Sequence, residues 1–198
     1  MNVIVTGGAG FIGSHVVDLL LERGDQVAVV DNLSSGKRTN LNPGASLFEL
    51  DVRSPDLETA FRQFRPEAVF HLAAQVSVKL SVDAPVEDAE VNIKGTVNLL
   101  DQCRAFGVRR LVYISTGGAL YGEPEWLPCT EEHPVNPLSP YGVSKYAAEK
   151  YVELYGRLYG LEYTILRFAN VYGPRQDPHG EAGVVAIFTQ RMVKGEEV

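Results

Sequence analysis

TGGAGFIG, residues 6–13, decides the fold of this chain, because it joins an apolar run at residues 3–5 to a segment with helical spacing at residues 11–23. Glycines at such a junction allow a tight turn, close approach of the backbone to a pyrophosphate, and close packing of helix on strand. The N-terminus of the following helix adds N–H groups and partial positive charge. The stretch predicts a dinucleotide-binding turn, although three glycines can also mark a simple turn.

A carboxylate at the end of the second predicted strand supports a dinucleotide site. The apolar run at residues 27–30 ends at Asp31, whose side chain can accept hydrogen bonds from the adenosine ribose and would repel a 2′-phosphate. We therefore predict NAD rather than NADP. Lys37 and Arg38 lie close by in the sequence and keep NADP as the alternative. Asp51-Val52 lies at the end of the third predicted strand. Contact with the adenine and a role in a turn are equally good interpretations of this pair.

A second motif places a phenol and an ammonium together far downstream. In Tyr141-Gly142-Val143-Ser144-Lys145 the first and last residues are one helical turn apart and project from one face. A free tyrosine has a pKa of about 10, too high for a base at neutral pH. A nearby ammonium and a cationic nicotinamide ring would both lower that pKa. Behind a dinucleotide turn, Tyr141 and Lys145 are predicted to be catalytic.

Strand and helix patterns alternate along the whole chain. Apolar, strand-like runs occupy residues 3–5, 27–30, 47–50, 68–72, 111–114 and 163–166. Helical patterns occupy residues 11–23, 54–64, 86–106, 140–159 and 182–194. Short buried strands alternating with helices predict an α/β fold of Rossmann type, a doubly wound parallel sheet with helices on both faces. We predict an NAD-binding domain at 1–170 and the start of an incomplete substrate-binding domain at 171–198.

Composition narrows the classes of partner and the compartment. The formal charge of −7 without a basic run argues against nucleic acid, and no apolar stretch is long enough for a membrane span. Met1 runs straight into the first strand, so no signal peptide is expected. The two cysteines, Cys103 and Cys129, lack metal-like spacing and are predicted to be free thiols. We predict a cytoplasmic protein without a metal site.

Together these motifs resemble the extended short-chain dehydrogenase/reductase family and, within it, the UDP-glucose (UDP-galactose) 4-epimerases. The resemblance runs in order through nearly the whole chain. It is carried by TGGAGFIGSH (6–15), DNLSSGK (31–37), HLAAQVSV (71–78), VNIKGT (91–96), STGGALYGE (115–123), SPYGVSKYAAEKY (139–151) and LRFANVYGPRQ (166–176).

The resemblance implies an NAD-dependent isomerase acting on a nucleotide sugar, most simply a UDP-hexose. NAD would stay bound through turnover, and Tyr141 would take the proton of the sugar 4-hydroxyl as hydride passes to the nicotinamide. The transient 4-keto sugar would then rotate and receive the hydride on its other face. Asn170 would help to bind the substrate diphosphate. The full set of expected cofactor residues is Gly7, Gly10, Phe11, Ile12, Gly13, Asp31, Asn32, Asp51, Val52, Leu72, Ala73, Ala74, Asn92, Tyr141, Lys145 and Phe168.

The sequence departs from the family at the third catalytic position. The family usually places a Ser or Thr four residues before the tyrosine of its Tyr-Gly pair, and here that position is Gly117. We expect Thr116 to take the role and to contact the substrate, with a water as the alternative and Ser115 structural. No acidic residue follows Thr116, although the family's dehydratases and decarboxylases carry one there. Epimerisation is therefore favoured over elimination.

Length is the second departure, because family chains continue well past residue 198. The chain is expected to be a fragment or a naturally short protein, with the cofactor half complete and the sugar-nucleotide half not. Two alternatives stay open: another nucleotide-sugar oxidoreductase of the same family, and a non-catalytic NAD-binding module. The apolar faces of helices 86–106 and 140–159 exceed what one sheet needs, so the resemblance implies a homodimer.

Overall fold

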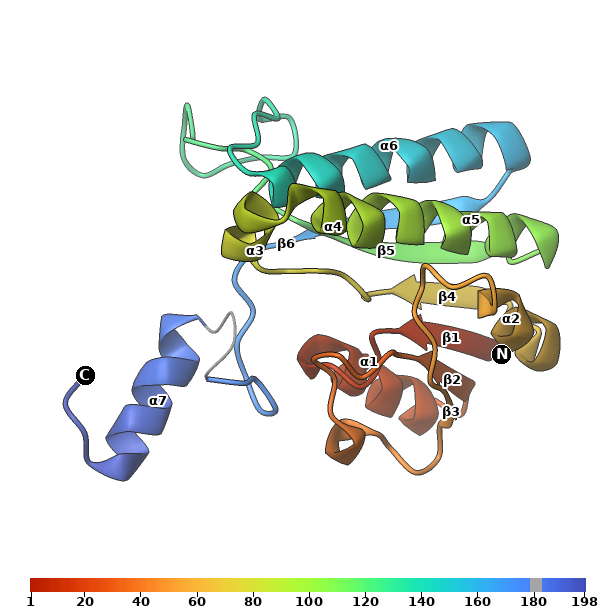
Figure 1. Cartoon of the computed structure of the whole chain (residues 1–198), viewed down its shortest axis with the longest axis horizontal. Coiled ribbons are helices and arrows are strands. Elements are labelled where there is room, and N and C mark those ends of the chain that lie inside the picture. Colours follow the sequence, from red (N-terminus) through yellow and green to blue (C-terminus); the bar gives the residue numbers. More distant parts are fainter. Residues whose placement is uncertain (179–182) are drawn as a thin grey trace.

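A six-stranded parallel sheet organises the chain in this computed structural model, which describes residues 1–178 and 183–198. The strands are β1 (Asn2–Thr6), β2 (Gln26–Val30), β3 (Ser46–Phe48), β4 (Ala68–His71), β5 (Arg110–Thr116) and β6 (Glu162–Phe168). Their order in the sheet is β3-β2-β1-β4-β5-β6 (Figure 1). The order reverses between β1 and β4, and ligands of such sheets bind at the carboxyl ends of the strands beside that point.

Helices cover both faces of the sheet (Figure 1). They are α1 (Phe11–Glu22), the 3₁₀ turn η1 (Arg38–Asn40), α2 (Leu57–Phe64), α3 (Val78–Asp83), α4 (Pro85–Ala89), the π-helical turn η2 (Glu90–Lys94), α5 (Gly95–Ala105), α6 (Pro140–Tyr159) and α7 (Val184–Lys194). Val17 and Leu20 of α1 pack on one face, and residues of α2, α5 and α6 pack on the other. The predicted doubly wound α/β sheet is confirmed.

Helix α6 begins and ends at residues with clear local signals, and its start positions the tyrosine. The Ser139 side chain accepts a hydrogen bond from the Gly142 N–H at 3.1 Å, and Pro140 occupies the first turn. The helix ends at Gly160, whose φ of 71° lies in the left-handed region that favours glycine. Tyr141 therefore sits in the first turn of α6, at the carboxyl edge of the sheet.

Three predicted helices differ in detail from those observed. The segment predicted as one helix over 86–106 is α4, a π-helical turn and α5, and it follows a separate short helix, α3. The helix predicted over 54–64 begins at Leu57, because the Ser54 hydroxyl accepts a hydrogen bond from Asp56 N–H and holds residues 54–56 in a turn. The helix predicted over 182–194 is α7 from Val184 onward, and Ala182 lies outside the described residues.

Candidate functional site

The glycine turn has the close backbone contacts that its sequence predicts. Gly7 has φ of +69°, and a Cβ at this position would lie 2.8 Å from the Ala73 nitrogen. A Cβ at Gly13 would lie 2.1 Å from the Gly7 carbonyl oxygen. Gly10 caps α1 without a side chain, so no side-chain oxygen of the cap competes for the first N–H groups, around Phe11 and Ile12. The turn thus packs too closely to admit side chains at Gly7 and Gly13, as a phosphate-binding turn requires.

The loop after β2 holds this turn through its central residue, Ala9. The Asp31 carboxylate accepts a hydrogen bond from the Ala9 N–H at 2.9 Å. The Ala9 carbonyl in turn accepts from the Lys37 backbone N–H at 2.9 Å and from Asn40 Nδ2 at 3.0 Å. Asp31 is buried, and its other oxygen accepts from the Leu33 N–H at 2.8 Å. Asp31 therefore lies against the glycine turn at the end of β2, and both of its oxygens accept hydrogen bonds within the chain.

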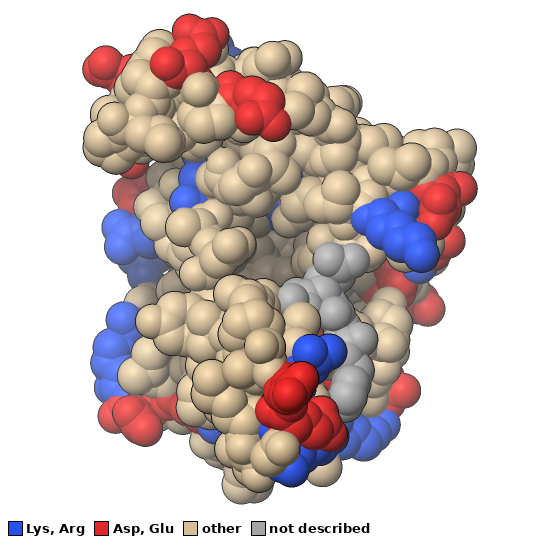
Figure 2. Space-filling model, turned by 90° about the vertical axis from the view of Figure 1, so that its left-hand side faces the viewer, with Lys and Arg blue, Asp and Glu red and all other residues tan. Residues whose placement is uncertain are grey.

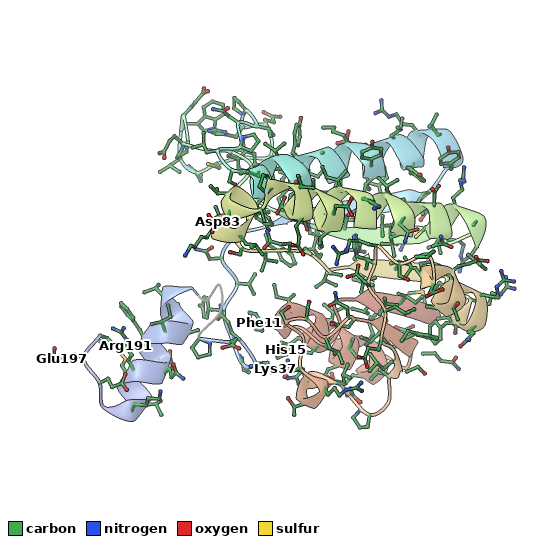
Figure 3. The ribbon with its side chains drawn as sticks, in the orientation of Figure 1. Phe11, His15, Lys37, Asp83, Arg191 and Glu197 are labelled. Carbon is green, nitrogen blue, oxygen red and sulfur yellow. The ribbon has the colours of Figure 1, made fainter. Side chains whose placement is uncertain are left out.

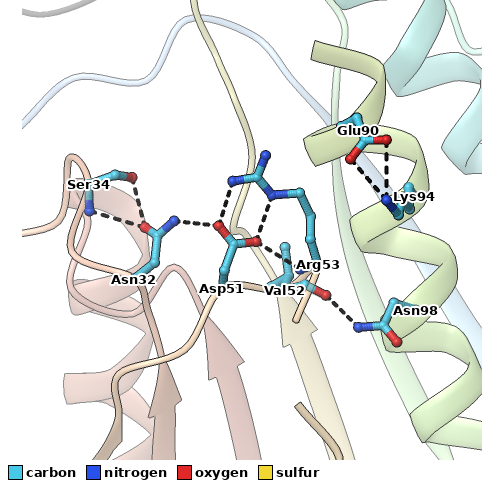
Figure 4. Close-up of polar contacts among 8 residues, drawn as sticks. All are labelled: Asn32, Ser34, Asp51, Val52, Arg53, Glu90, Lys94 and Asn98. Atoms are coloured by element: carbon cyan, nitrogen blue, oxygen red, sulfur yellow. Dashed lines mark hydrogen bonds and ion pairs between the residues drawn. The ribbon is translucent and has the colours of Figure 1, made fainter. Parts of the chain in front are cut away.

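A polar cluster joins the ends of β2 and β3 (Figure 4). Asn32 Nδ2 donates to Asp51 at 2.8 Å, and the Arg53 guanidinium donates to both Asp51 oxygens at 2.9 and 2.8 Å. The hydrogen bonds from Arg53 lower the pKa of Asp51 to about 2, so its carboxylate is ionised at neutral pH. Asn98 Nδ2 donates to the Val52 carbonyl at 2.7 Å. These contacts are the turn chemistry predicted as one of two roles for Asp51.

The two cations that argued for NADP are paired with carboxylates. Lys37 Nζ lies 2.8 Å from Asp177, and the Arg38 guanidinium contacts Glu49. A 2′-phosphate would need such cations free to bind it. Their pairing supports the preference for NAD.

A buried histidine fixes the end of β4. The Thr96 hydroxyl donates to the Asn92 carbonyl at 2.7 Å, so its oxygen accepts from His71 Nε2 at 3.0 Å. His71 Nδ1 then accepts from the Thr6 hydroxyl at 2.7 Å. Burial lowers the pKa of His71 to about 3, in agreement with a neutral ring. His71 is a satisfied buried histidine, as its sequence context predicts.

The segment after β4 is held in place from both sides. Thr6 Oγ1 accepts hydrogen bonds from the N–H groups of Leu72 and Ala73, at 3.2 and 3.1 Å. The Asn92 side chain accepts from the Gln75 N–H at 3.0 Å and donates to the Gln75 carbonyl at 2.9 Å. Leu72, Ala73 and Ala74 therefore form a fixed, half-buried edge beside the glycine turn. Asn92 bonds to backbone, which is the structural role that its helix position also allowed.

Tyr141 meets Thr116 at the carboxyl end of β5. Burial raises the pKa of Tyr141, and a hydrogen bond with Thr116 acts in the opposite direction. Thr116 Oγ1 also accepts from the Ala119 N–H at 3.3 Å. Gly117 instead donates its backbone N–H to the Phe168 carbonyl at 2.7 Å, and the Ser115 hydroxyl is buried without a partner among the described residues. The hydroxyl beside Tyr141 thus belongs to Thr116.

Lys145 lies one turn along α6 and is buried. Its ammonium donates to the Ile114 carbonyl at 2.6 Å and lies 4.4 Å from the centre of the Tyr113 ring. Burial lowers the pKa of Lys145 to about 7. From the sequence, this ammonium is predicted to lower the pKa of Tyr141. In this structure it faces β5 instead, and burial raises the pKa of Tyr141.

The end of β6 contributes Phe168 and, just beyond it, the exposed Asn170. The chain then crosses to α1 (Figure 3), where His15 Nε2 donates to the Pro174 carbonyl at 2.9 Å. From the sequence, Arg175 and His179 are equally candidates for contact with an anionic substrate and for a solvated loop. Arg175 pairs with Asp18 at 2.6 Å, and His179 lies outside the described residues.

The carboxyl ends of the strands form one face of the molecule, which Figure 2 shows from outside. This face is hollowed in its middle, and the visible walls of the hollow consist mostly of residues other than Lys, Arg, Asp and Glu (Figure 2). Among the described residues no cluster of His, Cys, Asp and Glu has the composition of a metal site. None of their helices combines the length and apolar character that crossing a bilayer requires.

Two buried carboxylates near the site, Glu149 and Asp88, were not predicted from the sequence. The Arg167 guanidinium donates to both oxygens of the fully buried Glu149, at 3.0 and 2.7 Å, and to the Tyr121 hydroxyl at 2.9 Å. Glu149 lies one turn beyond Lys145 on the same face of α6, and this spacing was the available signal. Asp88, fully buried on α4, gave no signal, because it resembles an ordinary polar residue of a helix.

The sheet order and the glycine turn define a Rossmann-type dinucleotide-binding domain. Residues 3–198 match the model of the "NAD dependent epimerase/dehydratase family". The chain belongs to this family, whose description names the cofactor. The glycine turn fits that cofactor, because its backbone packs too closely for a Cβ at Gly7 or Gly13, as the turn that approaches a pyrophosphate requires.

Similar proteins are UDP-glucose 4-epimerases. The structure of the Thermotoga maritima enzyme with UDP-glucose is 57% identical, with a TM-score of 0.97, and covers 100% of this chain and 65% of that one. The Thermus thermophilus enzyme in complex with NAD is 58% identical, with a TM-score of 0.95 and coverage of 100% and 64%. The Mycolicibacterium smegmatis enzyme is 50% identical over 200 residues, 98% of this chain. The chain spans about 64% of the length of that relative.

Proposed function

We propose that this chain is the cofactor-binding part of an NAD-dependent nucleotide-sugar 4-epimerase of the UDP-glucose/UDP-galactose type. The observation that carries the proposal is the position of Tyr141, in the first turn of α6 beside the Thr116 hydroxyl at the end of β5, on the same edge of the sheet as the dinucleotide turn. The identity of 57–58% to two epimerases, one solved with UDP-glucose and one with NAD, supports the same substrate class.

The proposed cofactor contacts are distributed over five strand ends and two helical segments. Gly7, Gly10, Phe11, Ile12 and Gly13 would hold the pyrophosphate, and Asp31 with Asn32 the adenosine ribose. Asp51 and Val52 would lie at the adenine; Leu72, Ala73, Ala74, Asn92 and Phe168 would line the remaining path to Tyr141 and Lys145. When bound, NAD supplies the hydride acceptor and a positive charge that lowers the pKa of Tyr141.

The residues of the chain carry out the proton chemistry. Tyr141 Oη takes the proton of the sugar 4-hydroxyl and returns it after the 4-keto sugar has turned its other face. Thr116 holds the phenol and the sugar oxygen in line, which favours proton transfer over short distances. Lys145 places a positive charge beneath the site, since its ammonium is fixed against Ile114 and Tyr113.

The substrate half of the site is proposed to lie largely outside this chain. We assign 1–170 to the NAD-binding domain and 171–198 to the start of a substrate-binding domain. Asn170, which is exposed at the junction of the two, would contact the substrate diphosphate. Since the relatives are longer, turnover by this chain alone is the open experimental question.

The test is conversion of UDP-galactose to UDP-glucose by the chain as it stands, with bound NAD and released NADH measured in parallel. The Tyr141→Phe variant should bind NAD as the wild type does and lose conversion, because only the hydroxyl is removed. Conversion by Tyr141→Phe at the wild-type rate would overturn the proposal. Stoichiometric NADH release would favour an oxidoreductase, and bound NAD without product a binding module.

We also propose a homodimer in the cytoplasm. Exposed apolar side chains follow one another along α6, and they are Val143, Tyr151, Leu154 and Leu158. A second copy would bury them. Cys103 and Cys129 are free thiols, which suits a reducing compartment. Light scattering after gel filtration measures the oligomeric state, and a monomer of 21.7 kDa would contradict the dimer.

A further inference from the structure

A buried carboxylate that the proposed chemistry does not use lies on α4. Asp88 is completely buried, and its Oδ1 accepts hydrogen bonds from Gln75 Nε2 at 2.7 Å and from Asn92 Nδ2 at 3.0 Å. Its Oδ2 is buried without a partner among the described residues. A buried carboxylate with an unpaired oxygen is costly, and native proteins retain such groups mainly where they serve a function.

The two amides that Asp88 holds are those that fix the segment after β4. Asn92 exchanges two hydrogen bonds with the Gln75 backbone, and Gln75 Nε2 also donates to the Ser77 carbonyl at 3.0 Å. Removal of Asp88 would leave Gln75 and Asn92 each with a donor that has lost its acceptor. Asp88 is thus the common acceptor of the contacts that shape the segment beside the glycine turn.

Asp88 also faces the catalytic pair, because α4 packs against α6. Its charge raises the pKa of both Tyr141 and Lys145. The other charged group that acts on Lys145 is Glu149 on its own helix, while β4 contributes the neutral His71 and β5 the Tyr113 ring. The charged residues of α3, Lys79 and Asp83, are exposed.

We propose that Asp88 is a positioning residue of the Tyr141–Lys145 pair: it fixes Gln75 and Asn92 and supplies a buried negative charge on the helix that packs against α6. The role rests on the proposed function, since it concerns the same tyrosine. Its consequence is that the tyrosine keeps its proton until a cationic cofactor is present, because a nearby negative charge opposes formation of tyrosinate.

The experiment measures the titration of Tyr141 itself, in the chain as it stands. Protein labelled with ¹³Cζ-tyrosine is titrated by NMR, and Tyr141→Phe assigns the signal. The Asp88→Asn variant removes the charge and keeps an oxygen for Gln75 and Asn92. The matched control is Glu87→Gln, which removes the same charge one residue away, from an exposed side chain that acts on Arg53.

Tyr141 should titrate at lower pH in Asp88→Asn than in the wild type, and at the wild-type pH in Glu87→Gln. An unchanged titration in Asp88→Asn, or an equal shift in the control, would overturn the proposal. Asp88→Ser is a second neutral variant with an acceptor oxygen. If both neutral variants fail to fold, Asp88 serves stability rather than positioning, and the proposal is overturned.

The titration separates this proposal from the proposed function. If the chain has no epimerase activity, the NMR signal of Tyr141 still reports the effect of Asp88. If the chain is active, both limbs of the pH profile of kcat should move to lower pH in Asp88→Asn, because Asp88 raises the pKa of both members of the pair.

Discussion

Replacement of Lys145 by methionine should make the nucleotide-free protein more stable. The lysine has a pKa of about 7 in the folded chain against 10.5 in an unfolded one, because burial disfavours the ammonium. At about 1.36 kcal/mol per pKa unit, this difference costs the folded state roughly 5 kcal/mol at pH 7. A methionine carries no such cost and fills a similar volume.

Part of that gain is offset by the contacts that the ammonium makes. Lys145→Met leaves the Ile114 carbonyl without its donor at 2.6 Å, which costs about 1–3 kcal/mol. We therefore expect a net stabilisation of about 2–4 kcal/mol near neutral pH. Urea unfolding of the nucleotide-free protein measures it. The control is Lys150→Met, an exposed lysine of the same helix, which should stay within about 0.5 kcal/mol of the wild type.

The pH dependence of this gain tests the reasoning. The pKa of Lys145 is lowered on folding, so between about pH 7 and 10.5 the unfolded chain binds a proton that the folded chain does not. Wild-type stability from this group thus rises with pH, and the advantage of Lys145→Met should shrink by about 1.4 kcal/mol per pH unit above neutrality. A destabilised variant, or an advantage that does not change with pH, would refute the argument.

Three further outcomes follow from the buried contacts. Gly13→Ala should abolish NAD binding and destabilise the chain by about 1–3 kcal/mol, because its Cβ would lie 2.1 Å from a carbonyl oxygen. Calorimetry measures the binding. The control is Gly118→Ala, which should leave stability unchanged because a Cβ there has no atom within 4 Å. Arg167→Met should lower the free energy of unfolding by about 3–5 kcal/mol, measured in urea, because Glu149 is left unpaired. Adding Glu149→Met should restore most of that stability. Additive losses in the double variant would contradict the prediction. Because the pKa of His71 is lowered to about 3, its contribution to stability should fall below about pH 6.5, by about 1.4 kcal/mol per unit, and His71→Gln should show a flatter dependence.

Local signals account for the parts of the fold that the sequence predicts well. Helix α6 has the predicted bounds, because Ser139, Pro140 and Gly160 act within one turn of its ends. The helix predicted over 86–106 contains a π-helical turn at Glu90–Lys94. The sequence did not predict this turn, because the apolar period remains readable on both sides of it. Helix α3 has six residues, too few for a periodic pattern to show.

The candidate site likewise has parts that the sequence predicts and parts that it does not. The glycine turn, Asp31 and the Tyr141–Lys145 pair were predictable because each is a short motif with fixed spacing. The Gln75–Asp88 and Glu149–Arg167 contacts were not, because their partners are 13 and 18 residues apart and are brought together only by the sheet and its helices. The direction of the Lys145 ammonium was likewise decided by the carbonyl of Ile114 on β5, a contact 31 residues away.

The three hydrogen bonds on Ala9 have a consequence for ligand affinity. They join the glycine turn to residues 31–40, so the turn holds its conformation in the absence of a ligand. Fixing one backbone residue costs about 1–2 kcal/mol, and here that cost falls on folding rather than on binding. A dinucleotide therefore meets a preorganised surface and loses little affinity to ordering it. Loosening residues 37–40, which hold the Ala9 carbonyl and lie outside the proposed ligand contacts, would therefore weaken binding.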